Sequence, residues 1–181
     1  MKVDYQLYAQ VENYLFGTVS AFFGERGYLT AFQFFTIIRW KANRAISRVA
    51  RRILSKSPSD LEDGVATLTR AIARAPDPRT KMQILIEDWG FRLPIASAIL
   101  TVCYPEIFTV YDVRTCETLG RFSEVAYKSN FDRIWNGYSD FMEAVKRETP
   151  ESLTLRDKDR WLWGKSAYNQ LKAQLEKGFG A

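Results

Sequence analysis

The chain has 181 residues, of which 46% are hydrophobic and 14% aromatic, so it can bury a substantial core and is not disordered along most of its length. It has no histidine and only two cysteines, Cys103 and Cys116, which excludes histidine-based triads, most zinc sites and a four-cysteine iron–sulfur cluster. Its net charge is +5, and no apolar run reaches the length of a membrane span, so we expect a soluble, cytoplasmic protein that favours polyanions.

The first third of the chain predicts amphipathic helices separated by glycine turns. Residues 4–16 carry apolar side chains at spacings of three and four, which is typical of a helix. Thr30 and Gln33 form a capping-box pattern at the start of an apolar helix that reaches Trp40 and breaks near Asn43. Turns are predicted at three glycines between these helices, namely Gly17, Gly24 and Gly27.

A basic run follows within and after this apolar helix. No acidic residue occurs from Arg39 to Lys56, although the segment carries seven positive charges: Arg39, Lys41, Arg44, Arg48, Arg51, Arg52 and Lys56. This local charge exceeds the net charge of the whole chain. Charge runs are usually solvated faces, but the complete absence of acid over this stretch favours contact with phosphates.

The middle of the chain predicts two helices that meet in a tight turn. A helix opens with the capping pattern of residues 59–62 and runs to Ala75, and residues 76–78 form a rigid turn. A helix over residues 79–89 then enters a bend at Gly90. Pro94 suits the first turn of a helix, so a buried helix is expected from Leu93 until Tyr104 and Pro105 end it.

A short helix is predicted directly after this buried one. Asp112 occupies an N-cap position, Val113–Leu119 forms the helix, and Gly120 is its C-terminal stop. As an N-cap, Asp112 would stabilise this helix by about 1 kcal/mol whatever the protein does. A purely structural role for Asp112 therefore stands beside a catalytic one.

The last third of the chain predicts two long helices. One is capped by residues 129–132 and reaches Glu148, and the other, which is one long helix or a pair of helices, starts with the capping pattern Thr154 to Asp157. The second helix is expected to pack against the body through Trp161, Leu162, Trp163, Tyr168, Leu171 and Leu175. No alternation of period two is longer than four or five residues, so the fold is expected to be all-α.

The stretch GFRLPIASAIL from Gly90, followed by Asp112, resembles the helix-hairpin-helix DNA glycosylase superfamily, which includes endonuclease III. Gly90 matches the first hairpin glycine, Ala96 matches the alanine that opens the helix, and Asp112 matches the catalytic aspartate. The resemblance implies a single domain over residues 1–181, an all-α, two-lobed helical bundle. Its hairpin would span residues 79–103 and its aspartate loop residues 104–120.

Three other segments resemble parts of small bacterial proteins of unassigned function that carry the same hairpin helix. They are Tyr28-Leu29-Thr30, Arg39-Trp40-Lys41 with Arg44, and Asp159-Arg160-Trp161-Leu162-Trp163. The resemblance thus covers most of the chain, although its specific part is about thirty residues long.

Two departures from the family pattern change what the resemblance implies. Pro94 stands eighteen positions before Asp112, where bifunctional members carry a nucleophilic lysine, and it cannot form a Schiff base. The implied enzyme is therefore monofunctional, with water as the nucleophile and Asp112 as its base. Arg92 replaces the second hairpin glycine, which hinders close approach of the backbone to a phosphate but supplies a guanidinium that can reach it.

The resemblance and the basic run together give a set of expected site residues. Asp112 is the catalytic residue, and two aromatic side chains, Tyr104 and Tyr111, are expected as pocket walls. DNA is expected to contact Gly90, Phe91, Arg92, Leu93, Lys41, Arg44, Arg48, Arg51 and Arg52. We expect no metal or iron–sulfur cofactor, although the resemblance allows a monovalent cation at the hairpin when DNA is bound.

These expectations describe a nucleoid-associated glycosylase that excises a damaged or modified base. The main alternative is a non-catalytic helix-hairpin-helix protein that binds DNA, which Arg92 and Pro94 favour. A further alternative is a helical interaction module whose basic face meets an acidic protein. The sequence does not name the base, because specificity depends on pocket shape and on contacts to exocyclic groups.

Overall fold

The computed structural model describes residues 5–178, and within that range every regular element is helical, which confirms the predicted all-α fold. In chain order the elements are α1 (Tyr5–Ala9), α2 (Val11–Asn13), the π-helical η1 (Tyr14–Val19), α3 (Ser20–Arg26), α4 (Ala31–Ala42), the 3₁₀ turn η2 (Asn43–Ala45), α5 (Ile46–Lys56), α6 (Leu61–Arg74), α7 (Pro78–Gln83), the π-helical η3 (Ile84–Asp88), α8 (Leu93–Cys103), α9 (Val113–Leu119), the 3₁₀ turn η4 (Val125–Tyr127), α10 (Phe131–Arg147) and α11 (Leu155–Lys177).

Helix α8 is the centre of the fold. Every residue of α8 except Pro94 is buried, and the helix packs against α3, α4 and α7. The small side chains of α8 allow neighbouring helices to pack closely against it. The Ser97 hydroxyl accepts a hydrogen bond from the Tyr111 backbone N–H at 2.9 Å. The chain after α8 is thus anchored to the central helix, which fixes the start of α9.

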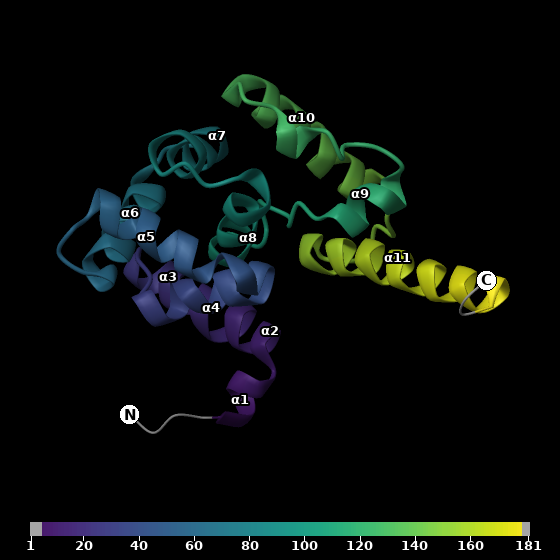
Figure 1. The fold of residues 1–181 in the computed structure, drawn as a ribbon, viewed down its shortest axis with the longest axis horizontal. Coiled ribbons are helices and arrows are strands. Elements are labelled where there is room, and N and C mark those ends of the chain that lie inside the picture. The colour runs from purple at the N-terminus through teal and green to yellow at the C-terminus, as the bar shows by residue number, and fades with distance from the viewer. Residues whose placement is uncertain (1–4, 179–181) are drawn as a thin grey trace.

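The elements divide into two groups in space. Figure 1 shows α1 to α8 gathered on one side of the molecule, with α9, α10 and α11 on the other. An extended segment that contains Val110 links α8 to α9 and joins the two groups. Helix α11 packs on α9 and α10. Within residues 5–178, no helix combines the length and the apolar character that crossing a bilayer requires.

Several helices begin or end at the residues that their capping patterns predict. Thr30 and Gln33 form the predicted capping box, and Gly120 ends α9 in the left-handed conformation, with a φ of 67°. Two of the predicted caps are wrong by one residue, because Asp60 and Asn130 cap α6 and α10 in place of the serines that precede them. In each case the longer carboxyl or amide side chain accepts the backbone N–H.

The N-terminal prediction of one helix and three glycine turns is largely wrong. The helix predicted over residues 4–16 is interrupted at Gln10, and residue 4 lies outside the described residues. Gly17 and Gly24 lie inside helical segments, whereas Gly27 does end α3 in the left-handed conformation. Burial of the neighbouring Leu15, Val19 and Phe23 outweighs the weak helix propensity of glycine here.

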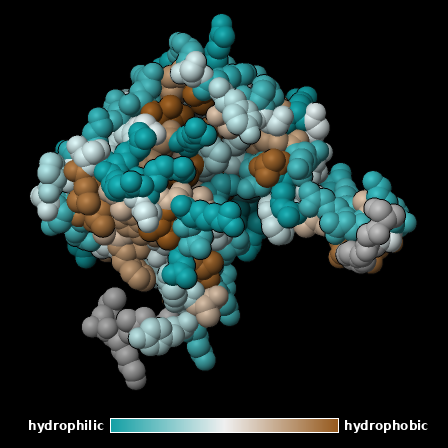
Figure 2. All heavy atoms as spheres, viewed as in Figure 1, coloured by the Kyte–Doolittle hydropathy of each residue, from teal (hydrophilic) through white to brown (hydrophobic). Residues whose placement is uncertain are grey.

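The prediction that α11 packs its aromatic and leucine side chains on the body is also wrong. Of the six side chains expected to face the body, only Leu162 is buried. The C-terminal part of α11 extends away from the rest of the molecule, as Figure 1 and the space-filling view in Figure 2 both show. The apolar spacing predicts a helix here, as observed, but it does not reveal which apolar face packs against the body.

Candidate functional site

Asp112 lies at the N-terminus of α9 and is held by two donors. One carboxylate oxygen accepts the Arg114 N–H at 2.9 Å, and the other lies 2.5 Å from the Lys41 Nζ. The Asp112 side chain is 25% exposed and that of Lys41 is 10% exposed. Burial opposes ionisation, but the Lys41 ammonium and the N–H donor outweigh it, so the pKa of Asp112 lies below its usual value.

Two cavities flank the Lys41–Asp112 pair. The first has a volume of about 480 Å³ and is lined by Glu12, Trp40, Lys41, Val110, Asp112, Arg156, Asp159, Arg160 and Trp163. The second has a volume of about 310 Å³ and is lined by Lys41, Ala42, Pro94, Tyr111, Asp112, Val113, Cys116, Ser123, Ala126 and Tyr127. Asp112 is therefore accessible from either side.

The first cavity contains an ion network that joins α2, at the start of the chain, to α11. Glu12 accepts from Arg160 at 2.6 Å and lies 3.2 Å from Arg156, which in turn lies 2.5 Å from Asp159. Burial raises the pKa of Glu12, but the two arginines reverse this effect and leave it below its usual value. The Trp40 indole donates to the same Glu12 carboxylate at 3.3 Å, so one acid links three elements.

Asp159 has a different environment from Asp112 although both line the first cavity. The residue is buried, and burial raises its pKa to about 6 despite the neighbouring Arg156 guanidinium. Lys41 also favours its ionised form, whereas the Asp112 carboxylate disfavours it. The cavity thus contains two carboxyl groups with lowered pKa values, Glu12 and Asp112, and a third, Asp159, whose pKa is raised to about 6.

The second cavity connects Asp112 to the hairpin. Pro94, in the first turn of α8, lines it together with Asp112, and the buried Tyr111 forms part of its wall. The Tyr111 hydroxyl donates to the Phe122 carbonyl, which fixes the ring, and burial raises its pKa. Burial also raises the pKa of Cys116 to about 11, so the thiol stays protonated and is a poor nucleophile at neutral pH.

The hairpin between η3 and α8 forms a third, basic hollow. Gly90 adopts a φ of 64°, a left-handed backbone conformation that favours glycine, and it lies beside the end of the flexible Arg52 side chain. The hollow measures about 170 Å³, and three arginines, Arg48, Arg52 and Arg92, are among its lining residues. No carboxylate of residues 5–178 forms an ion pair with any of the three.

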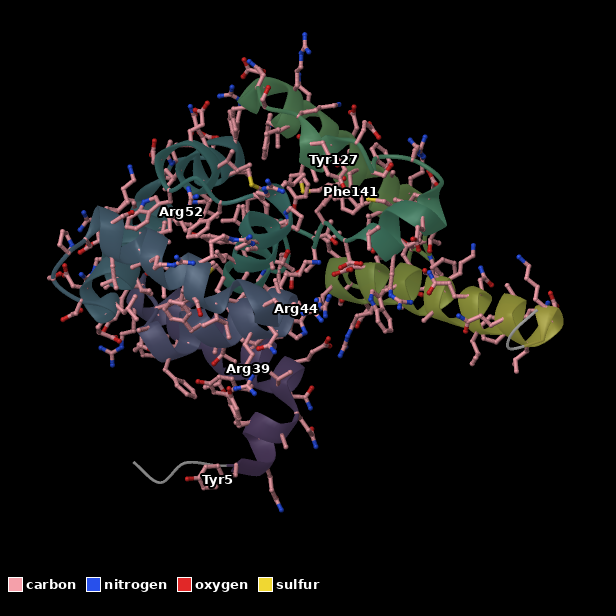
Figure 3. The ribbon with its side chains drawn as sticks, viewed as in Figure 1. Tyr5, Arg39, Arg44, Arg52, Tyr127 and Phe141 are labelled. Atoms are coloured by element: carbon pink, nitrogen blue, oxygen red, sulfur yellow. The ribbon has the colours of Figure 1, made fainter. Side chains whose placement is uncertain are left out.

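Other residues of the basic run have different positions. Arg39, Arg44 and Arg51 are exposed but do not line the hollow, and Figure 3 shows Arg39 and Arg44 apart from Arg52. The expectation that Lys41 contacts DNA is at odds with the structure, because its ammonium lies in the ion pair with Asp112. The basic run predicts that the Lys41 ammonium contacts a phosphate. In the structure it is paired instead with the carboxylate of Asp112, which is 71 positions away in the sequence.

Three further expected site residues are buried or occupied by other contacts, although Phe91 itself lines the basic hollow. The Phe91 side chain is buried and its N–H donates to the Leu85 carbonyl at 2.8 Å, so neither is free for a phosphate. The Leu93 side chain is buried too, which leaves only its backbone N–H at the start of α8. Tyr104 lines neither cavity beside Asp112 and instead contacts the rings of Phe23 and Phe108.

The sequence pattern did not identify Glu12, Arg156 or Asp159 as site residues. Asp159 is one turn past the N-terminus of α11, where an acid is ordinarily a surface residue, and no local signal reveals its burial. The basic run predicts Lys41 as a DNA contact, whereas the segment containing Asp159 is marked in the sequence only by a resemblance. The structure brings them together at Asp112.

Among residues 5–178, histidine, cysteine, aspartate and glutamate form no group of three or more that could hold a metal ion. No known protein family, curated protein or solved structure matches this chain.

Proposed function

We propose that this protein binds DNA through a helix-hairpin-helix element and excises a damaged or modified base as a monofunctional N-glycosylase, with α1–α8 and α9–α11 as its two lobes. One observation supports the proposal above all others: Pro94 at the start of the hairpin helix and the Asp112 carboxylate line the same cavity. A DNA strand bound at the hairpin would therefore place one of its nucleotides beside the ionised Asp112 carboxylate.

The basic hollow is the proposed phosphate site. Arg48, Arg52 and Arg92 carry positive charge without a carboxylate partner in the described chain, and Arg92 precedes the N-terminus of α8. Guanidinium groups and helix N-termini both favour phosphate oxygens. Such contacts position DNA without reading its sequence, so we expect binding with little sequence preference.

Asp112 is the proposed catalytic residue. Its low pKa keeps it ionised at neutral pH, and Lys41 and the Arg114 N–H fix its orientation. Each carboxylate oxygen can accept a further hydrogen bond, so Asp112 can orient a water molecule and stabilise positive charge that develops on the sugar. The extruded base would enter the second cavity, at a cost of a few kcal/mol for leaving the stack.

Water is the proposed nucleophile because the Lys41 amine, which lies beside Asp112, is held in an ion pair with that carboxylate. Pro94 has no amine, and the Lys41 ammonium is bound to Asp112 in a half-buried ion pair. An ammonium group has no lone pair with which to attack a sugar carbon. The expected product is therefore an abasic site in an intact strand.

The decisive experiment incubates the protein with single- and double-stranded oligonucleotides that carry different damaged or modified bases, followed by alkali to cut abasic sites. We expect one class of base to be released, with cutting only after alkali. Asp112→Asn should lose base release and keep DNA binding. The matched control, Asp140→Asn, changes an exposed acid on α10 and should retain both.

Two outcomes would contradict parts of this proposal. Strand cutting without alkali would exclude the monofunctional mechanism and direct attention to the Lys41 amine. Absence of base release with salt-sensitive DNA binding would favour the second candidate function, a non-catalytic helix-hairpin-helix protein. The basic hollow favours that candidate specifically, because it is complete without Asp112.

The phosphate site has its own test. Arg48→Ala combined with Arg92→Ala should weaken binding to all sequences alike and reduce the slope of log affinity against log salt by about 2, since each phosphate contact contributes roughly 0.9. The control is Arg133→Ala combined with Arg147→Ala, which removes two exposed arginines of α10 and so changes the net charge equally. Equal loss in the control would mean that net charge alone, and not the hollow, binds DNA.

A further inference from the structure

Two exposed aromatic side chains lie beside Asp112, one in each of the cavities that flank it. Tyr127 lines the second cavity and is 83% exposed, and Trp163 lines the first cavity and is 48% exposed. Val113, which is 63% exposed, also lines the second cavity. Single exposed apolar side chains are ordinary, but three that gather around one ionised acid indicate a contact surface.

The two cavities are neighbours. Lys41 and Asp112 line both of them, so this ion pair lies between them. The basic hollow continues the series, because Arg92 lines the hollow and Pro94, two residues further along the chain, lines the second cavity. The proposed phosphate site, the second cavity, Asp112 and the first cavity therefore follow one another on the protein.

The fold anchors the segment that carries Tyr127. Val125 is buried, and a Cβ at Gly137 of α10 would lie 2.8 Å from the Val125 Cγ2, so this glycine allows η4 to pack closely on α10. Phe122 adopts a φ of 76°, which is costly for a residue other than glycine, and its carbonyl accepts a hydrogen bond from the Tyr111 hydroxyl. The backbone before Tyr127 is thus held in place while its ring stays open to solvent.

Trp163 is also restrained. The Arg114 guanidinium carbon lies 5.0 Å from the centroid of the Trp163 ring, and the same guanidinium donates to the Gln170 amide oxygen at 3.0 Å. This contact holds the ring, although about half of the residue remains exposed. Restrained, exposed rings of this kind are suited to stacking against a planar group.

The charges of the first cavity favour an uncharged group over a phosphate. The acidic and basic side chains that line it form ion pairs with one another, namely Lys41–Asp112, Arg156–Glu12, Arg160–Glu12 and Arg156–Asp159. No basic side chain among the lining residues is left without a carboxylate to attract a phosphate. A nucleobase fits better, because its polar edges can exchange hydrogen bonds with these groups while its flat face stacks on Trp163.

These features favour an unpaired strand over a duplex. Two successive bases can occupy the two cavities only if both have left the stack, which is costly in a duplex and much less so in a single strand. Proteins bind single strands with a positively charged groove for the backbone and aromatic rings for the bases, since every base has a flat π face. The basic hollow, Tyr127 and Trp163 supply both elements.

We propose that the DNA bound by this protein is single-stranded, with the target base in the second cavity beside Tyr127 and the neighbouring base in the first cavity on Trp163. The sugar of the target nucleotide then lies at Asp112, and a phosphate of the same strand lies in the basic hollow. This inference rests on the proposed function for its DNA partner. It adds the strand state of the substrate and the two side chains that stack on it.

The test measures binding by fluorescence anisotropy, with one unmodified sequence of about twelve nucleotides supplied as single-stranded DNA, duplex DNA and single-stranded RNA. Single-stranded DNA should bind at least about tenfold more tightly than the duplex at the same salt concentration. Tyr127→Ala combined with Trp163→Ala should weaken single-strand binding at least about tenfold and leave duplex binding unchanged, because alanine removes the stacking surface. Tyr127→Phe combined with Trp163→Phe should keep the preference, since stacking requires only a ring.

The matched control is Trp161→Ala combined with Tyr168→Ala, which removes an exposed tryptophan and an exposed tyrosine of α11 that line neither cavity nor the basic hollow. An equal loss of single-strand binding in this control would overturn the proposal.

The other outcomes separate this inference from the proposed function. Equal or tighter binding of the duplex would overturn the single-strand inference alone, and tighter binding of the RNA would assign the surface to RNA instead. Because the oligonucleotides carry no damaged base, failure of the protein to release bases does not affect this result. Absence of binding to either form of DNA would reject the proposed function together with the inference.

Discussion

Asp112 and Asp159 line one cavity, but their surroundings shift their protonation in opposite directions. Asp112 caps α9, accepts a backbone N–H, pairs with Lys41 and keeps a quarter of its side chain exposed. Asp159 lies within α11, is buried, and has the single arginine partner Arg156. The number of donors and the access to water, not the residue type, decide which carboxyl group stays ionised.

The two acids can therefore play different chemical roles within the same cavity. An acid that is ionised at neutral pH can stabilise positive charge, whereas an acid with a pKa of about 6 can give up or take a proton near neutral pH. Each acid forms an ion pair with one basic residue, and these two basic residues lie on different helices. Asp112 pairs with Lys41 of α4, and Asp159 pairs with Arg156 of its own helix, α11.

The largest effect is expected for Asp159→Ala. This change leaves the Arg156 guanidinium in its buried position with Glu12 as its remaining acid, and loss of one member of a buried ion pair typically costs about 3 kcal/mol. Urea unfolding at pH 7 measures the free energy of unfolding. Asp140→Ala, on the surface of α10, is the control and should change it by less than about 0.5 kcal/mol.

A smaller effect is expected for Lys41→Met, which keeps the aliphatic stem and removes the charge beside Asp112. Asp112 retains its backbone donor and partial hydration, so the free energy of unfolding at pH 7 should fall by about 1–2 kcal/mol. The pKa of Asp112 should rise, so the stability that its ionised form contributes is lost at a higher pH on acidification. Carboxyl NMR titration measures that pKa. An unchanged value, or the same rise in the exposed variant Arg39→Met, would contradict the assigned ion pair.

Local chemistry made part of this structure predictable from sequence. The ends of α8 and α9 follow from Pro94, Asp112 and Gly120, because each residue has a backbone preference that acts within a few positions. The same reasoning failed at Gly17 and Gly24, where packing of neighbouring side chains decided the conformation. Short-range signals are reliable only where tertiary contacts do not compete.

The site itself depends on contacts that are distant in sequence. Lys41 and Asp112 are 71 positions apart and Glu12 and Arg160 are 148 apart, so no spacing rule pairs them. The apolar periodicity of α11 was visible, but the same pattern describes a face packed on the body and a face open to solvent. A basic run likewise does not reveal that Lys41 turns inward while Arg48 stays exposed.

The smallest effect is expected in the pH dependence of stability between pH 4 and pH 5. Because the folded-state pKa of Asp159 is raised to about 6, the native protein binds this proton more tightly than the unfolded chain does. This group therefore lowers the free energy of unfolding by about 1 kcal/mol as the pH rises over that interval. Asp159→Asn removes the titration but keeps a side chain that can accept from Arg156, so its stability relative to wild type should increase over the same interval. Urea unfolding of both proteins at pH 4 and pH 5 measures the difference. A constant difference would mean that Asp159 has an ordinary pKa, and that its environment does not differ from that of Asp112 in the way proposed.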